Sequence, residues 1–208
     1  MTDSTDRKWS RRKDARPAEI IEAAMDVFAE NGFAAAKLDD VAKRAGIVKG
    51  TLYRYYDTKE DLFRAVVQHA MAANLEAIQQ SAAGFKGSIR ELVPILLMRA
   101  AEHKGSSRVP ALARLVIGES RAFPDLARIW HDNVVARVLA LLTELIRDAQ
   151  GRGEVRPGDP KLHAFSIVGP MVTALLFHEV FDGSSAHAPD VESLAAQHAE
   201  TVLRGIMV

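Results

Sequence analysis

Apolar residues recur every three or four positions through most of the chain, the spacing that places them on one face of a helix. The first clear run is Ile20, Ile21, Ala24, Val27 and Phe28, and no stretch shows the apolar–polar alternation typical of a strand. The pattern predicts an all-α protein of about nine helices. We expect them over residues 17–31, 38–45, 49–55, 58–80, 88–103, 109–120, 124–151, 159–181 and 190–205.

Residues with special backbone preferences mark several of the expected helix ends. Pro17 suits the first turn of a helix, where its missing N–H is not needed. Gly32 suits the left-handed conformation in which many helices end. Thr58 with Asp61 is similar to a capping box, and Asp159–Pro160 places a capping side chain before a first-turn proline. These signals indicate where the helices start and stop.

Composition restricts the class of protein. Of the 208 residues, 48% are hydrophobic, which provides enough apolar surface for a packed core. The absence of cysteine excludes disulfide frameworks and thiolate metal sites, and it is typical of a reducing compartment. The apolar stretch 164–177 is too short to cross a bilayer and predicts a deeply buried helix. No apolar signal segment lies near the N-terminus, so we expect a cytoplasmic protein without a membrane partner.

Charge is unevenly distributed, although 27 basic and 27 acidic residues balance. One short segment near the N-terminus has a single acid, Asp14, among the bases Arg7, Lys8, Arg11, Arg12, Lys13 and Arg16. A solvated flexible tail and an arm that binds nucleic acid share this composition. Charge alone leaves the two interpretations open.

The segment 38–55 has the layout of a helix-turn-helix, in which a turn of about three residues joins two short helices. Ala42 is small where the two helices approach each other. Gly46 can take the positive φ that reverses the chain, and Ile47 and Leu52 supply apolar contacts that fix the crossing angle. Together these features favour a helix-turn-helix over an ordinary helical hairpin.

One segment resembles the N-terminal domain of TetR/AcrR-family transcriptional regulators: residues 20–67, IIEAAMDVFAENGFAAAKLDDVAKRAGIVKGTLYRYYDTKEDLFRAVV. A second is similar to the effector domain of the AcrR-like branch: residues 112–130, LARLVIGESRAFPDLARIW. The resemblance implies a ligand-responsive repressor that a small hydrophobic effector releases from a palindromic operator in double-stranded DNA. It also implies a flexible basic arm at 1–16, a helix-turn-helix domain at 17–63 and an effector-binding and dimerisation domain at 64–208.

In this family the recognition helix corresponds to residues 49–55, which the resemblance assigns to base and phosphate contacts. The side chains suit that role, because arginine pairs with guanine and tyrosine hydroxyls bond phosphates. The resemblance also favours the arm interpretation of the basic segment. We therefore expect DNA contacts from Lys37, Lys49, Gly50, Thr51, Tyr53, Arg54, Tyr55 and Lys59, and from Arg11, Arg12 and Lys13 of the arm.

Two positions depart from the family pattern. Val48 stands where a serine or threonine usually caps the recognition helix, and Lys37 stands where threonine is usual. For the three tyrosines of this region, core packing is the alternative to DNA contact, and we expect it for Tyr56. The departures concern individual DNA contacts and leave the predicted fold unchanged.

The resemblance further implies a homodimer, because one helix-turn-helix module contacts little DNA. The last two predicted helices carry apolar stripes suited to a dimer surface or to the internal core: Phe165, Val168, Gly169, Val172 and Leu176, and Val191, Leu194, Ala195, His198 and Val202. The middle helices would enclose the effector. The candidate lining residues, with ordinary core packing as the alternative, are Leu96, Arg99, His103, Trp130, Asn133, Arg137, Phe165 and Met171.

Two other functions are disfavoured. For a helical enzyme, the seven histidines form no H-x-x-x-H pair, and the sequence contains no nucleophile elbow, phosphate-binding glycine loop or Glu-x-x-His signature. We therefore expect no catalytic residue, metal or cofactor. A helix-turn-helix that binds a protein instead of DNA is disfavoured by the basic arm and by the polar, aromatic character of residues 49–55.

Overall fold

A computed structural model describes residues 3–83, 87–102, 108–181 and 185–208. Within these ranges the chain is helical, and its one β-type contact is an isolated bridge between Val155 and Met207. The predicted all-α fold is confirmed. The elements are α1 (Asp3–Ala35), α2 (Leu38–Arg44), α3 (Lys49–Leu52), α4 (Lys59–Ala83), α5 (Ile89–Glu102), α6 (Val109–Glu119), α7 (Pro124–Trp130), the π-helical turn η1 (His131–Val135), α8 (Ala136–Gly151), α9 (Pro160–Phe181) and α10 (Val191–Ile206).

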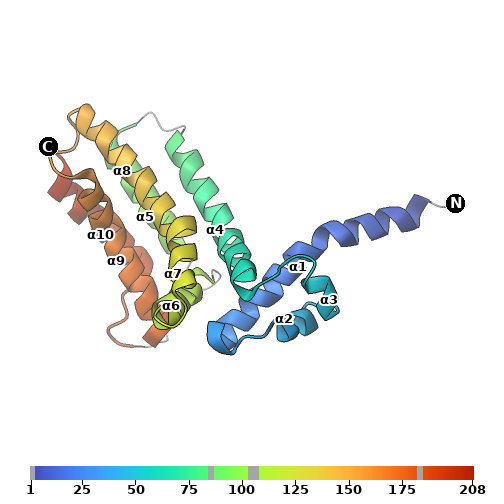
Figure 1. Cartoon of the computed structure of the whole chain (residues 1–208). Helices are drawn as coiled ribbons and strands as arrows, with labels where there is room; N and C mark the ends of the chain where they lie inside the picture. Colours follow the sequence, from blue (N-terminus) through green and yellow to red (C-terminus); the bar gives the residue numbers. More distant parts are fainter. Residues whose placement is uncertain (1–2, 84–86, 103–107, 182–184) are drawn as a thin grey trace.

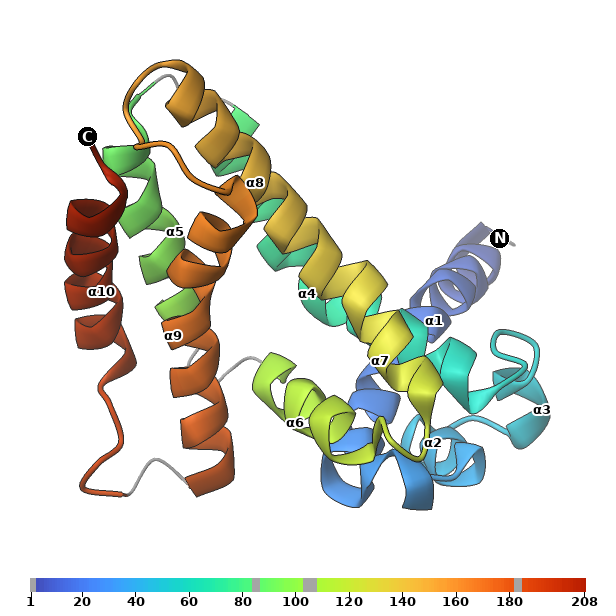
Figure 2. The ribbon, with the colours of Figure 1, turned by 60° about the vertical axis from the view of Figure 1, so that its left-hand side comes forward.

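The helices form two groups, which α4 joins. Figure 1 shows α1, α2 and α3 on one side of the molecule and α5, α8, α9 and α10 on the other, with the long α4 running between them. In Figure 2, α6 lies across the gap between α9 and α1, and it packs against both helices. This position makes α6 a direct connection between the two groups.

Buried side chains form two separate clusters that do not follow the sequence order. The first combines the apolar faces of α1, α2, α3 and α4 with side chains from α6 and α7, such as Leu112, Leu126 and Ile129. In its centre, the ring centroids of Phe28, Phe33 and Phe63 lie 5.6–5.7 Å apart. The second cluster is built by α5, α8, α9 and α10. Two helices from the C-terminal half of the chain thus belong to the N-terminal core.

Most predicted helix ends are confirmed by the backbone. Gly32 has φ 73° and ψ 175°, a positive-φ conformation that interrupts the helix at the predicted position, although its ψ lies outside the left-handed helical region. The Asp61 amide donates to the Thr58 hydroxyl over 3.0 Å, which starts α4 as the capping box predicts. The Lys161 amide donates to the Asp159 carboxylate over 2.8 Å at the start of α9. These ends are set by residues within one turn of each other.

Two predictions about helix boundaries are corrected. The first helix begins at Asp3, so Pro17 lies inside it, in a segment rich in arginine and lysine, which favour helix. The predicted helix 124–151 is interrupted by the π-helical turn η1. There the Asn133 side-chain amide donates to the Ile129 carbonyl over 2.7 Å, a side-chain insertion into the helical ladder that explains the irregular turn.

The prediction that the apolar helix around residues 164–177 is deeply buried is also corrected. Only one face of α9 points into the second core, through Ala164, Ile167, Met171 and Ala174. Among the described residues, α9 is the one helix with the length and hydropathy of a membrane-crossing segment. Its remaining apolar side chains line a cavity or face the surface.

Candidate nucleic-acid interface and ligand cavity

The turn between α2 and α3 has the geometry that the sequence predicts. Gly46 has φ 65°, its amide donates to the Lys43 carbonyl over 3.2 Å, and the Ile47 amide donates to the Ala42 carbonyl over 3.0 Å. This pair of bonds is the Schellman motif, which needs a left-handed residue where Gly46 stands. Leu52 is fully buried in the first core. One buried side chain and one glycine therefore fix how α3 leaves the body of the protein.

The outer face of α3 and the turn after it carry most of the predicted DNA-contacting residues. Thr51 is half-buried, and Tyr56 packs against the first core, where burial raises the pKa of its hydroxyl. The helix ends at Leu52, so the last part of the predicted recognition helix is a turn. The side chains and backbone open to solvent are those of Lys49, Gly50, Tyr53, Arg54 and Tyr55.

Lys49, the first residue of α3, is held by an acid that sequence reasoning missed. Its Nζ lies 2.8 Å from Asp39 Oδ1, and this hydrogen-bonded pair raises the pKa of the ammonium. The same Nζ lies 5.7 Å from the centre of the Tyr53 ring. Both partners of the ion pair are exposed, so the contact contributes little to stability but sets the position of the cation. The available signal was the acidic pair in the first turn of α2.

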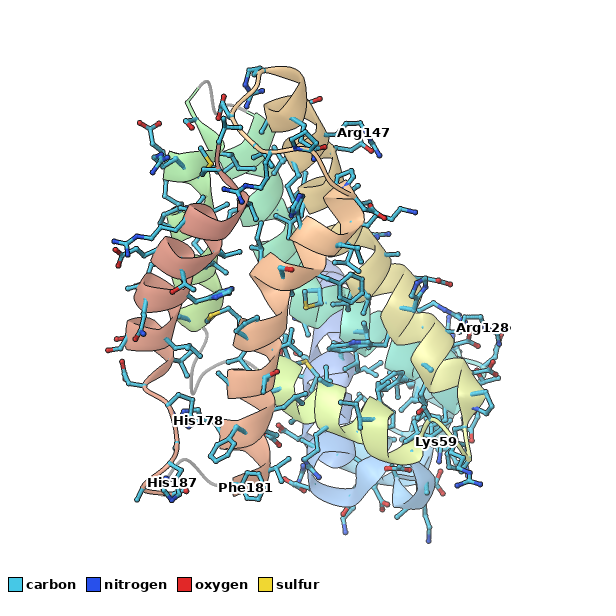
Figure 3. The ribbon with its side chains drawn as sticks, turned by 90° about the vertical axis from the view of Figure 1, so that its left-hand side faces the viewer. Lys59, Arg128, Arg147, His178, Phe181 and His187 are labelled. Atoms are coloured by element: carbon cyan, nitrogen blue, oxygen red, sulfur yellow. The ribbon has the colours of Figure 1, made fainter. Side chains whose placement is uncertain are left out.

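The structure assigns Lys59 a place different from the predicted phosphate contact. Its Nζ donates to the carbonyl oxygens of Phe33, Ala34 and Ala36 at 2.6, 3.3 and 3.1 Å, and it lies 4.5 Å from the centre of the Phe33 ring. In Figure 3, Lys59 is labelled at the junction between the N-terminal helices and α7. Since backbone carbonyls bind this ammonium, Lys59 stabilises the fold and is not available for the predicted phosphate contact.

The remaining predicted DNA contacts differ in how far the structure describes them. Lys37 is exposed at the N-terminal end of α2. Its backbone is extended, and its side chain makes no capping hydrogen bond to the helix. The side chains of Arg11, Arg12 and Lys13 lie outside the described part of the chain, although the backbone of α1 passes through these positions. Their contact with DNA stays a prediction.

The absent cap of α3 leads to a first testable prediction. Val48 precedes α3 without a side-chain hydrogen bond and is 73% exposed. Replacing it with serine supplies a hydroxyl for a free amide of the first turn, which is worth about 1 kcal/mol. We expect Val48→Ser to raise the melting temperature by about 2–4 °C in calorimetry, while Val48→Ala, which adds no acceptor, leaves it unchanged. Equal melting temperatures for the two variants would contradict this account.

A carboxylate from α6 holds the last residues of α1, which follow the interruption of the helix at Gly32. Glu119 accepts hydrogen bonds from the backbone amides of Phe33, over 2.8 Å, and Ala34, over 2.7 Å. Gly32 makes room for it, since a Cβ on that residue would lie 2.5 Å from Glu119 Oε1. The two sides of this contact are 86 residues apart in the sequence. We name the contact between Glu119 and residues 32–34 the α6–α1 junction.

The other end of α6 is attached to α1 as well. Arg108, which precedes the helix, places Nη2 2.7 Å from Asp26 Oδ1 and Nη1 3.3 Å from Glu22 Oε2. Within α6, Arg114 Nε lies 3.0 Å from Glu179 Oε1 of α9. Both ends of α6 therefore contact α1, whereas the middle of α6 forms an ion pair with α9 of the second group of helices.

A cavity of about 610 Å³ lies between the two cores, within the size range typical of small-molecule sites. Its walls come from α4, α5, α6, α7, η1, α8 and α9, and most of them are aliphatic. The described lining residues are Met71, Arg99, Ala100, Val109, Pro110, Ala113, Val116, Ile117, Trp130, Val134, Val135, Val138, Leu139, Phe165, Val168, Gly169, Val172, Thr173, Leu175 and Leu176.

Three of the predicted effector residues line this cavity: Arg99, Trp130 and Phe165. Four others take different places. Leu96 and Met171 are buried in the second core, Arg137 is exposed, and the Asn133 side chain bonds Gln68 and the Ile129 carbonyl. The remaining one, His103, lies outside the described residues. Sequence reasoning missed the aliphatic walls from α6 and α8, because such side chains look like ordinary core.

The two stripes predicted for the dimer surface differ in the structure. All five residues of the α9 stripe line the cavity, and two of them remain well exposed, Phe165 at 58% and Val172 at 45%. The α10 stripe faces inward: Val191 and Ala195 are fully buried and Val202 nearly so. The His198 ring bonds the Ile167 carbonyl over 3.0 Å. For α10 the core-packing alternative therefore applies, since its apolar face packs on α5.

Two family models match the chain. The model of bacterial regulatory proteins of the tetR family matches residues 20–66, and the model of the AefR-like transcriptional repressor C-terminal domain matches residues 96–205. The second match alone spans more than half of the 208 residues. The chain belongs to the TetR family. The match over residues 20–66 includes α2, the turn at Gly46 and α3, so this chain is a DNA-binding transcriptional regulator of the helix-turn-helix type.

Curated relatives agree with this assignment. The HTH-type transcriptional regulator YhgD of Bacillus subtilis is 26% identical over 196 residues, 90% of this regulator and 94% of YhgD. The fatty acid metabolism regulator protein of Bacillus subtilis is 36% identical over 70 residues, but this match spans only 33% of this chain and 36% of that protein. The first is named as a transcriptional regulator and the second as a regulator of fatty acid metabolism. The likeness to the second is local, so its activity does not transfer to the whole regulator.

Solved structures show the same fold over nearly the whole length. FadR from Bacillus subtilis, in complex with stearoyl-CoA, is 22% identical and has a TM-score of 0.76, covering 91% of this regulator and 98% of that chain. SmeT, the repressor of the multidrug efflux pump SmeDEF of Stenotrophomonas maltophilia, is 17% identical with a TM-score of 0.71, covering 92% and 90%. At these identities the likeness concerns the fold alone.

Proposed function

We propose that this TetR-family regulator represses transcription by binding, as a homodimer in the cytoplasm, to a two-fold symmetric operator. The observation that carries the proposal is the exposed group of Lys49, Tyr53, Arg54 and Tyr55 on α3 and the turn after it, which Gly46 and Leu52 hold in place. Cationic and phenolic side chains suit contacts to phosphates and base edges. In a dimer, two such rows about 34 Å apart match successive major grooves.

We further propose that a small, largely apolar effector occupies the cavity and releases the DNA. The cavity draws its walls from α6 and from α9, while both ends of α6 are attached to α1. A ligand that fits only one arrangement of these helices shifts the protein towards that arrangement, and hence changes its affinity for DNA. The stearoyl-CoA bound by FadR is an example of a ligand with a long apolar chain in a protein of this fold.

The same observations support a division of the chain into three functional parts. We propose residues 17–63 as the DNA-binding domain, residues 64–208 as the effector and dimer domain, and residues 1–16 as a basic arm along the DNA. The exposed part of the α9 stripe supports a surface for the second copy, with Phe165 and Val172 as its most exposed members. In this proposal the protein works by binding, without catalysis.

Two substitutions test the DNA interface. Lys49→Ala removes a cation from α3, and Tyr53→Ala removes an exposed phenol from the turn after it. We therefore expect each variant to weaken operator binding about tenfold without changing the melting temperature. Fluorescence anisotropy with the DNA upstream of the protein's own gene, titrated at two salt concentrations, measures the affinity. Lys161→Ala, which removes an exposed cation from the start of α9, is the control and is expected to bind like the unaltered protein.

The experiment also separates the proposed function from its alternatives. Salt-sensitive and sequence-selective binding by the unaltered protein, weakened in the Lys49→Ala and Tyr53→Ala variants, supports operator binding through α3 and the turn after it. Binding that both variants retain would mean that the contacts lie elsewhere. Failure of the unaltered protein to select any sequence from a random DNA pool would overturn the proposal.

A further inference from the structure

The described part of the cavity wall combines one positively charged residue with many apolar side chains. Among its described lining residues, Arg99 of α5 carries the one charge, and there is no acid. Two further lining residues have a polar group, the indole N–H of Trp130 and the hydroxyl of Thr173. The Thr173 hydroxyl already donates to the Gly169 carbonyl over 3.0 Å. The rest of the wall is almost entirely valine, leucine, isoleucine, alanine and proline. The wall thus offers one cation on a predominantly aliphatic surface.

This combination discriminates between classes of ligand. A cationic ligand finds no carboxylate among the described lining residues and is repelled by Arg99. A strongly polar ligand loses its hydration without regaining hydrogen bonds on aliphatic walls. An aliphatic chain gains from leaving water, because this gain is proportional to the apolar area that is buried and requires no directional contact with the wall.

The charge also lies where an anion can reach it. Arg99 lines the cavity and is also exposed, so its side chain lies where the cavity meets solvent. A guanidinium has five N–H donors in a planar fork, so a contact within the protein leaves donors for a carboxylate or phosphate oxygen. An anionic group at this position stays partly hydrated while the chain attached to it is buried.

We propose that the effector is an amphiphilic anion: an aliphatic chain that occupies the cavity and ends in a single anionic group bound by Arg99. The inference deepens the proposed function, because it names the ligand class of the same cavity. Binding of the ligand itself does not depend on DNA, so the two proposals fail independently.

Three probes with one chain length and different head groups test the class. Decanoate is anionic, decanol is neutral and decyltrimethylammonium is cationic. Trp130 lines the cavity, and Trp9 is the other tryptophan of the chain, so Trp9→Phe leaves Trp130 as the single fluorescent reporter. Titrations below the micelle concentration are expected to give about fivefold tighter binding for decanoate than for decanol, the size of effect of a partly exposed charge pair, and the weakest binding for the cation.

Variants test whether Arg99 causes the preference for decanoate over decanol. In the Trp9→Phe background, Arg99→Gln is expected to bind decanoate and decanol equally, with decanol affinity unchanged. Arg137→Gln, which removes an exposed arginine of α8 that does not line the cavity, is expected to keep the fivefold preference. Ala113→Phe adds a ring to the cavity wall and is expected to abolish binding of all three probes.

Two outcomes overturn the inference. One is equal or tighter binding of decanol or of the cation by the unaltered cavity. The other is an anion preference that survives Arg99→Gln. If decanoate binds as expected while the protein selects no DNA sequence, the ligand class stands and the repressor proposal falls. If the protein binds an operator but the cavity does not bind decanoate, the repressor proposal stands and the ligand class is wrong.

Discussion

Replacing Gly32 with alanine is expected to lower the free energy of unfolding of this regulator by about 3 kcal/mol. Gly32 has φ 73° and ψ 175°, a region that side-chain-bearing residues hardly populate, so alanine introduces backbone strain. Its methyl group would also lie 2.5 Å from Glu119 Oε1 and push the carboxylate away. The amides of Phe33 and Ala34 then lose their acceptor. The backbone strain and the loss of the two hydrogen bonds both lower the free energy of unfolding.

Urea unfolding followed by circular dichroism measures this effect. Gly118→Ala is the matched control: the glycine lies one residue before Glu119, inside α6, and a Cβ there meets nothing within 4 Å. Because alanine favours helix over glycine, this variant is expected to be as stable as the parent or slightly more stable. Glu119→Ala tests the second part of the argument, since it unpairs the amides without straining Gly32. We expect it to lose about 1–2 kcal/mol; no loss in either Gly32→Ala or Glu119→Ala would refute the α6–α1 junction as a stabilising contact.

Glu154→Gln is expected to lower the free energy of unfolding at neutral pH by about 2 kcal/mol. Glu154 follows α8 and caps the start of α5, accepting from the Ser88 hydroxyl over 2.7 Å and the Ile89 amide over 3.0 Å. Its other oxygen accepts from Arg152 Nε over 2.7 Å. These bonds, the one from Arg152 first, lower the pKa of the carboxyl to about 2. The side chain is 23% exposed, so solvent screens the contacts only in part.

The same group makes stability depend on pH in a defined window. Because the pKa of Glu154 is lower in the folded protein than its ordinary value of 4.5, the stabilisation is complete above pH 4.5 and is lost as the pH falls towards 2. Denaturant titrations at several pH values should show a shallower acid dependence for Glu154→Gln than for the parent. Glu144→Gln, which breaks an exposed ion pair with Arg147 inside α8, is the control and should follow the parent closely. Identical acid profiles for Glu154→Gln and the parent would count against this role of Glu154.

The sequence by itself determined the features that depend on neighbouring residues. Helix ends at Gly32, Thr58 and Asp159 need only a glycine or a capping side chain within one turn, so a local pattern is sufficient. The positive φ of Gly46 and the burial of Leu52 follow in the same way from the spacing of the helix-turn-helix. The recognition residues were assigned through the resemblance to TetR/AcrR-family regulators, because their positions in the family motif can be read directly from the sequence.

The tertiary structure alone decided which distant surfaces meet. Asp39 holds Lys49, the α6–α1 junction joins residues 86 positions apart, and Lys59 turns towards backbone carbonyls instead of solvent. The apolar face of α10 packs on α5, while that of α9 is left for the cavity and the surface, although the two stripes look alike in sequence. Helical periodicity specifies that a face is apolar but not which partner covers it, because burial energy depends on area and has no direction. Only the packed chain selects the partner.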